Sequence, residues 1–205
     1  MADENSVHRI SNRESHFNVN PVYRIGGYLL DQSCETCDLG IIIDNKLNFN
    51  GHVSRIAHNA QVHASLIRQT FVSRGPEILT KAFITYVRPL LEYCTPVWSL
   101  HTACNASKIE LCQRWFATCI KGQYGLDYHQ RLAFLGLESL HVRRIKYDLI
   151  MCYKILNGKV SLHRNFLALF VSTHTRGHKY KLYKHHSSVN AQNYFFSNRH
   201  LECFT

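Results

Sequence analysis

A change in hydrophobic period near residue 49 is the feature that most limits the folds open to this sequence. The run from Cys37 to Phe49 is a compact apolar block rich in β-branched residues, which is typical of a buried strand that leads into a turn. From Asn50 onward the apolar residues recur at steps of three and four, the spacing of an amphipathic helix. We therefore expect a mainly α chain with a small N-terminal β hairpin or strand element, an α+β fold.

A hairpin is expected ahead of that strand. Gly26-Gly27 lies between the β-forming segments 22–25 and 28–30. Glycine tolerates the positive φ angles that two-residue hairpin turns need. This pattern predicts two short antiparallel strands joined by the glycine pair.

Five helices are predicted after residue 49 from their start and stop signals. The first runs from a cap at Asn48 or Asn50 to about Phe71. Gly75-Pro76 closes it and opens a strongly apolar second helix, which Pro89 must kink or interrupt because proline lacks a backbone donor. The other three are listed here: from Asn105 or Ser107 to Gly122; Tyr128 to Leu135, with Asp127 as cap and Gly136 as stop; and Ser139 to Gly158.

The last of these helices carries several cations. On its helical wheel, Arg143, Tyr147 and Lys154 lie roughly opposite the predicted apolar face, and Arg144 and Lys146 lie to the sides. A cationic face that includes an aromatic residue suits contact with a nucleic-acid backbone, although a merely solvated face gives the same pattern. The predicted apolar face comprises Val142, Ile145, Leu149, Cys152, Tyr153 and Leu156.

The charge is uneven along the chain. Residues 1–48 carry a net charge of −3, residues 49–140 of +4 and residues 141–205 of +9, within a total of +10 at pH 7. A basic C-terminal third favours polyanionic partners, phosphate backbones above all. In the segment 175–186, tyrosines alternate with lysines and histidines, a composition that suits base stacking and phosphate contact. Plain disorder and a histidine metal site are the alternatives for this segment.

The eight cysteines are expected to remain thiols. The N-terminus has no apolar core of a signal peptide, so we expect an intracellular protein, nuclear or cytoplasmic and not secreted, in a reducing compartment. No run approaches 18 apolar residues, which argues against a membrane span. Cys34-x-x-Cys37 lacks a second ligand pair, so it is only a weak zinc signal.

Catalytic motifs are missing from the sequence. It has no Gly-x-Ser-x-Gly elbow, no glycine-rich phosphate loop and no His-Glu-x-x-His pair. Two-metal phosphoryl transfer needs carboxylates that hold ions ~3.5–4 Å apart, whereas Asp38 and Asp44 on one strand would lie roughly 20 Å apart at ~3.3 Å per residue. We expect no catalytic residue, no metal or other cofactor and no small-molecule substrate: the chain is not an enzyme on its own.

In order and spacing, segments from about residue 8 to 200 resemble the reverse transcriptases of non-LTR retrotransposons of the jockey and chicken-repeat type. The ordered set carries the resemblance, not any single motif. The segments are Asp38–Val53, Val87–Ser99, Ile109-Glu110 with Gln113-Arg114, Arg131-Leu132 with Leu135–Leu137, Arg143-Arg144 with Asp148–Ile150, Tyr153–Gly158, Thr175–His178 and Tyr194–Ser197.

The resemblance implies a division of the chain and a lost activity. Members of this family copy RNA into DNA with palm aspartates and Mg²⁺, and that aspartate box would lie upstream of residue 1. Residues 8–47 resemble the last palm strands, and residues 50–158 a helical, thumb-like bundle with its extension. We therefore predict a residual palm-edge β segment at 1–48, a thumb-like domain at 49–158 and a basic, loop-rich tail at 159–205.

The predicted function is that of a catalytically incomplete reverse-transcriptase fragment of a mobile element, which retains a surface for RNA–DNA template–primer duplex. A missing palm domain supplied in trans is a possible partner, and no membrane partner is expected. The alternative is a helical protein-interaction module with no nucleic-acid role. The candidate nucleic-acid-binding residues are Arg88, Arg143, Arg144, Lys146, Lys154, Arg176, His178, Lys179, Lys181 and Lys184.

Overall fold

A computed structural model describes residues 23–29, 33–72, 75–98, 102–160 and 193–199. The chain divides into two units between Cys34 and Glu35. The described residues are mainly helical, with two small antiparallel strand pairs ahead of the helices. This confirms the predicted α+β class.

The first unit contains the predicted hairpin. Strands β1 (Arg24–Ile25) and β2 (Tyr28–Leu29) pair in antiparallel register. Gly26 and Gly27 both have positive φ angles, 58° and 85°, which only glycine adopts without strain. The glycine pair therefore makes the turn, as its position predicts.

The second unit opens with another hairpin where the sequence predicts one strand. Strands β3 (Glu35–Asp38) and β4 (Ile41–Asp44) are antiparallel, with Asp38 opposite Ile41. Leu39 and Gly40 turn the chain with φ angles of 45° and 83°. The expectation of one continuous strand was wrong because apolar composition does not reveal a turn that leucine enters at positive φ. Asp38 and Asp44 lie on two different strands, so the distance of roughly 20 Å that was expected along a single strand does not apply.

Helix α1 (Asn50–Thr70) begins without the predicted asparagine cap. Instead, the Asp44 carboxylate accepts hydrogen bonds from the backbone N–H groups of Lys46, Asn48 and Phe49, at 2.9, 3.1 and 2.9 Å. The side-chain oxygen of Asn50 accepts from Asn105 at 2.6 Å instead. Asp44 thus ties the β3–β4 hairpin to the start of the helix.

Pro89 interrupts the second helical stretch, as predicted. The stretch consists of α2 (Pro76–Ala82), a π-helical turn η1 (Phe83–Val87) and α3 (Arg88–Glu92). Proline lacks an N–H and crowds the preceding turn, and a widened turn relieves that crowding. Phe83, Val87 and Leu91 are all fully buried along this stretch, so it lies in the core.

The remaining helices follow their local signals closely. Helix α4 (Ala103–Thr118) starts earlier than predicted because Thr102 caps it by accepting from the N–H of Asn105. Helix α5 (Tyr128–Leu135) has the predicted Asp127 cap and the Gly136 stop. Helix α6 (Leu140–Leu156) has the Ser139 cap. A short helix, α8 (Phe196–Arg199), follows later in the chain.

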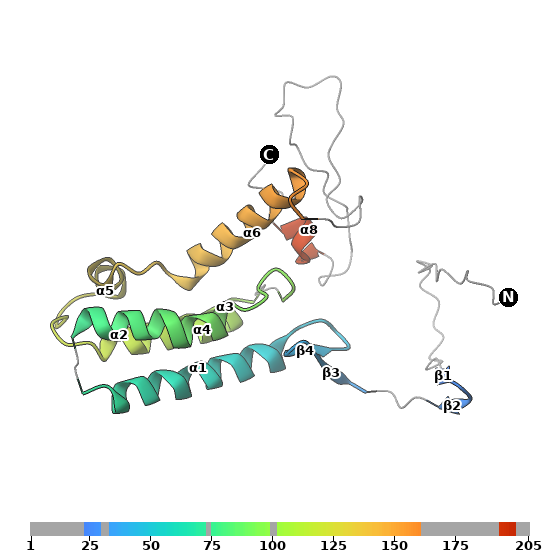
Figure 1. The fold of residues 1–205 in the computed structure, drawn as a ribbon, viewed down its shortest axis with the longest axis horizontal. Coiled ribbons are helices and arrows are strands. Elements are labelled where there is room, and N and C mark those ends of the chain that lie inside the picture. Colours follow the sequence, from blue (N-terminus) through green and yellow to red (C-terminus); the bar gives the residue numbers. More distant parts are fainter. Residues whose placement is uncertain (1–22, 30–32, 73–74, 99–101, 161–192, 200–205) are drawn as a thin grey trace, which may run out of the picture. The chain divides into compact units, whose positions relative to one another are not determined.

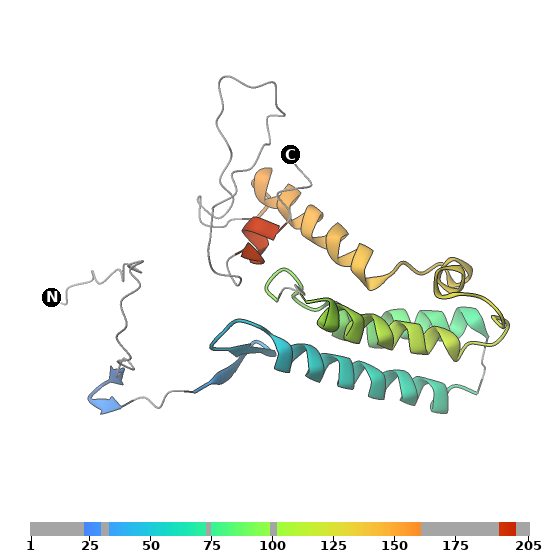
Figure 2. The ribbon, with the colours of Figure 1, turned by 180° about the vertical axis from the view of Figure 1, so that it is seen from behind.

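The core lies between α1, the α2–η1–α3 stretch and α4. These helices lie side by side in both ribbon views (Figures 1 and 2) and contact one another. At their centre the rings of Phe83 and Phe116 stack with their centroids 4.7 Å apart. Helices α5 and α6 pack on α4. Among the described helices, none combines the length and apolar character that crossing a bilayer requires.

Candidate nucleic-acid interface

One side of α6 presents tyrosines and lysines together. Positions 146, 147, 150, 153 and 154 follow the helical repeat, so they share one face. All five side chains are exposed, with 57% of Tyr153 and 48% of Ile150 accessible. We call this surface the α6 stripe; its members are Lys146, Tyr147, Ile150, Tyr153 and Lys154.

The buried side of α6 differs from the predicted apolar face. Val142 and Tyr153 were predicted to be buried, but they are 42% and 57% exposed. Asp148 lies inside instead and is only 3% exposed. Its carboxylate accepts hydrogen bonds from Arg199 of α8, at 2.8 Å from Nη2 to Oδ1. A charge can be buried when such a partner compensates it, and no helical wheel reveals a partner that lies far along the chain.

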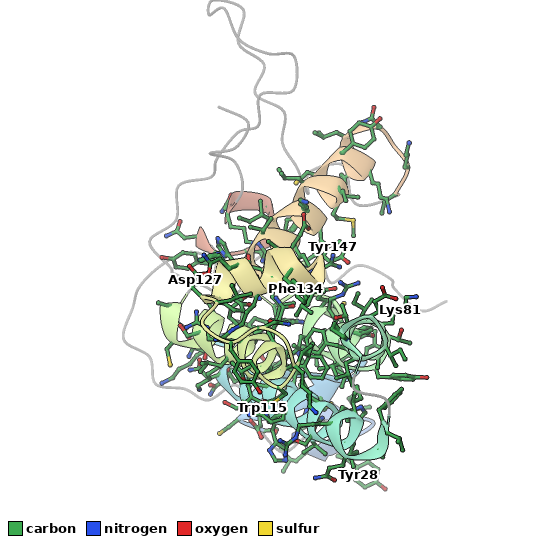
Figure 3. All side chains as sticks on the ribbon, turned by 90° about the vertical axis from the view of Figure 1, so that its left-hand side faces the viewer. Tyr28, Lys81, Trp115, Asp127, Phe134 and Tyr147 are labelled. Carbon is green, nitrogen blue, oxygen red and sulfur yellow. The ribbon has the colours of Figure 1, made fainter. Side chains whose placement is uncertain are left out.

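A groove runs between α3 and α6 beside the stripe. It encloses about 400 Å³ and is lined by Pro89, Tyr93, Pro96, Tyr147, Ile150 and Lys154, among others. Tyr93 is 55% exposed, and Tyr147 is labelled among the side chains in Figure 3. Two phenol rings and a lysine therefore line this α3–α6 groove.

Among the described residues that line the groove, Glu92 is the one carboxylate, and it is paired with two arginines of the protein. Arg143 donates to both of its oxygens, with an Nη2–Oε2 distance of 3.0 Å. Arg88 lies 3.8 Å from it, and the Tyr147 hydroxyl donates to it at 3.3 Å. The hydrogen bond to Glu92 raises the pKa of Arg143. The groove therefore presents little negative charge to an anionic ligand.

The structure gives the predicted cations different environments. Arg88 and Arg143 form ion pairs with Glu92, whereas Lys146 pairs with Glu138, and both of those side chains are about half exposed. Lys154 is exposed and has no carboxylate partner among the described residues. The other predicted cations of the tail lie outside the described residues: Arg176, His178, Lys179, Lys181 and Lys184.

Arg144 faces a separate pocket between α4, α5 and the start of α6. It points away from the α6 stripe, as its position on the helix requires. Burial lowers the pKa of Arg144, while the nearby carboxylates of Glu110 and Asp148 oppose that change. Arg144 therefore does not share a surface with Lys154.

Sequence reasoning missed Tyr93 as a site residue and misplaced Tyr153. Tyr93 follows Pro89 by four positions, and this spacing, which is visible in the sequence, allows both residues to line one side of α3. Tyr153 was assigned to the apolar face because it falls with Leu149 and Leu156 on the helical wheel. The pairing of Arg143 with Glu92 had no local signal.

The described residues contain no group of three or more histidine, cysteine, aspartate and glutamate side chains placed to hold a metal ion. The Mg²⁺ that the resemblance implies is thus not matched by the described carboxylates. Cys34 and Cys37 are exposed free thiols, each in a different unit of the chain.

Comparison with known proteins yields a distant relative. The chain is 25% identical to an uncharacterized protein of Caenorhabditis elegans over 125 residues, which is 60% of this chain and 63% of that protein. The match thus spans less than two thirds of the relative. No family model matches the sequence, and no solved structure gives a significant match. The relative supplies no activity that could be transferred.

Proposed function

We propose that this chain is a thumb-like nucleic-acid-binding module of the reverse-transcriptase type, which holds an RNA–DNA template–primer duplex. The α6 stripe beside the α3–α6 groove is the observation that carries the proposal. The ordered resemblance to polymerases of non-LTR retrotransposons and the net charge of +10 support it.

The lysines of the stripe have a spacing that suits a duplex backbone. Lys146 and Lys154 are eight residues apart, about 12 Å along the helix at ~1.5 Å per residue. For an α6 helix that lies parallel to the duplex axis, this distance corresponds to about three or four steps of one strand at an axial rise of ~3.4 Å each. Lys154 has no carboxylate partner among the described residues, and the exposed pair of Lys146 with Glu138 is of the kind that contributes roughly 0–1 kcal/mol. A phosphate can therefore replace Glu138.

The tyrosines supply the second component of binding. An exposed phenol ring offers a flat apolar surface on which a sugar or an unpaired base at a strand end can pack. Tyr93 and Tyr147 line the groove, and Arg143 holds Tyr147 by donating to its hydroxyl. The ring is thereby oriented before the ligand arrives, which reduces the entropy lost on binding.

In this proposal the chain holds the duplex and does no chemistry. The aspartates and Mg²⁺ of the polymerase reaction would come from the catalytic part of a palm, either in the same polypeptide or in trans. The element of origin is a mobile one, and this region acts after the template and primer have paired.

The test is a fluorescence-anisotropy titration of the chain with a labelled RNA–DNA hybrid at increasing salt. We expect the logarithm of the association constant to fall linearly with the logarithm of salt, because each neutralised phosphate releases about 0.9 of a counterion. A flat salt response, or no binding at 50 mM salt, would contradict the proposal. Protein partners that stay bound after nuclease treatment would instead favour the helical protein-interaction module.

A further inference from the structure

A second pocket lies on the side of α6 away from the stripe. It encloses about 510 Å³ between α4, α5 and the start of α6. Its chemistry comes from Glu110, Arg114, Tyr128, Ser139, His141 and Arg144. We call it the α4–α6 pocket. The volume is within the range of roughly 300–1,000 Å³ that small-molecule sites occupy.

Two guanidinium groups supply donors to this pocket. Arg114 lies over the Tyr128 ring at 4.7 Å, which fixes one wall. Nη1 of Arg144 is buried and has no hydrogen-bond partner among the described residues. The start of α6 lies at the same pocket through Ser139, but the N–H groups of Leu140 and Val142 already donate to Glu110 and Ser139, so the arginines supply the unused donors. The pocket thus has more donors than its own acceptors use.

Glu110 supplies one acceptor that is also unused. Its Oε1 atom accepts from the Tyr128 hydroxyl and from the N–H of Leu140 at 3.3 Å. Its Oε2 atom is buried and has no partner within the described residues. Arg144 and Glu110 line the same pocket without forming an ion pair with each other. A ligand that offers both an acceptor and a donor would satisfy this buried donor and this buried acceptor together.

We infer that the α4–α6 pocket binds a phosphate monoester in its singly protonated form. The charged phosphate oxygens accept hydrogen bonds from Arg144 and Arg114, and the P–OH group donates to Oε2 of Glu110. No bond is made or broken. The ligand is either a free mononucleotide or phosphate, or the terminal phosphate of a nucleic-acid strand.

Glu110 makes this site selective. A phosphate monoester has a second pKa near 6, so part of it carries the needed proton near neutral pH. A phosphodiester has no P–OH group, and sulfate has none at this pH. Both would place an acceptor against the buried Oε2 atom, which is a repulsive contact. The pocket should therefore reject internal backbone phosphates and accept terminal ones.

This inference does not depend on the α3–α6 groove, since neither Lys154 nor Tyr93 lines the pocket. The test is calorimetric titration of the whole chain at pH 6.5 with AMP, inorganic phosphate, sulfate and the diester cyclic AMP. We expect AMP to bind at least tenfold more tightly than cyclic AMP, and phosphate to bind more tightly than sulfate. Equal affinities within either pair, or no binding of AMP and phosphate, would overturn the inference.

The two sources of the phosphate are separated by a further comparison. If a 5′-phosphorylated oligonucleotide binds more tightly than the same strand with a 5′-hydroxyl, the pocket takes a strand end. If the two strands bind equally while AMP still binds, it takes a free nucleotide. Binding of the 5′-hydroxyl strand itself reports on the groove, so failure of the proposed function and failure of this inference remain distinguishable.

Two variants assign the selectivity to residues. Arg144→Gln should weaken AMP binding at least tenfold, whereas Arg131→Gln, a half-buried arginine outside the pocket, should leave it within twofold. Glu110→Gln replaces an acceptor with a donor and should bring cyclic AMP to within threefold of AMP. Unchanged discrimination in a folded Glu110→Gln variant would contradict the role of Glu110. If this variant does not fold, the wild-type comparison of AMP with cyclic AMP still tests the same contact.

Discussion

Arg143 of α6 donates hydrogen bonds to both carboxylate oxygens of Glu92 on α3, 51 residues earlier in the chain. The side chains of both residues are largely buried, with 19% and 11% accessible. The charge of Arg143 is therefore compensated by Glu92 within the protein. Arg143 in turn compensates a negative charge in the α3–α6 groove, so in the proposed function Lys154 is the lysine of the groove that contacts phosphate.

Arg143→Ala should lower the free energy of unfolding, and it should change the charge of the exposed surface little. Removal of the guanidinium leaves the largely buried Glu92 with the Tyr147 hydroxyl and the more distant Arg88, so we expect a loss of about 2 kcal/mol in the free energy of unfolding. Urea unfolding followed by circular dichroism measures it. Arg143→Lys, which keeps the charge but not the paired hydrogen bonds, should recover only part of the loss. An unchanged urea midpoint in Arg143→Ala would show that the ion pair is not structural.

Lys154→Gln should weaken binding of the RNA–DNA hybrid without a loss of stability. One lost phosphate contact lowers the slope of log affinity against log salt by about 1, and we expect a roughly tenfold lower affinity near 100 mM salt. Lys81→Gln is the matched control, since Lys81 is an exposed lysine on α2 outside the groove. Equal effects of the two substitutions would mean that binding follows net charge alone.

Tyr93→Leu should weaken binding while the salt slope stays the same. The loss of an aromatic surface costs roughly 1–3 kcal/mol per stacked base when tyrosine is truncated, and it releases no counterion. Tyr93→Phe should bind like the wild type, because the ring carries the contact. Tyr124→Leu, at a site that is 92% exposed outside the groove, controls for general loss of surface tyrosine. A weaker Tyr93→Phe variant would point to the hydroxyl instead.

The free energy of unfolding should decrease as the pH is lowered below 6.5, in part because of His52. This histidine is 2% exposed, and burial, followed by the charge of Arg55, lowers its pKa. The unfolded chain takes up the proton at the ordinary pKa of about 6.5. Below that pH the unfolded state binds a proton that the folded state does not bind. The free energy of unfolding therefore decreases as the pH is lowered, until the pH reaches the folded-state pKa.

The variant His52→Gln removes this contribution. The difference in unfolding free energy between wild type and variant should therefore shrink as the pH is lowered from 7 to 5, as measured by urea titrations at fixed ionic strength. A constant or growing difference would show that His52 is not held neutral.

Local signals in the sequence predict the ends of the helices well. Asp127, Gly136 and Ser139 act within one turn of their own positions, and Pro89 acts on the turn just before it. Each effect depends on backbone geometry that a residue type sets by itself. The prediction of these features from sequence was therefore confirmed.

Long-range pairs account for what the sequence could not reveal. Asp148 pairs with Arg199, again 51 residues away, and so rotates the buried side of α6 relative to its apolar pattern. The Asp44 carboxylate on the preceding strand holds the turn before α1 by accepting from the N–H of Phe49, and neither predicted asparagine caps the helix. Such contacts form between elements whose packing depends on the whole fold, so the hydrophobic periodicity of one segment does not predict them.

The most direct test of the account is a photo-crosslink between the chain and an RNA–DNA hybrid whose strands carry thio-substituted bases near the primer end. Digestion and mass spectrometry then locate the attached peptides. The account predicts adducts on the peptides that contain Tyr93, Tyr147 and Tyr153, and their loss when salt is raised. Adducts confined to other peptides, with none on α3 or α6, would contradict the claim that the α3–α6 groove and the α6 stripe hold the duplex.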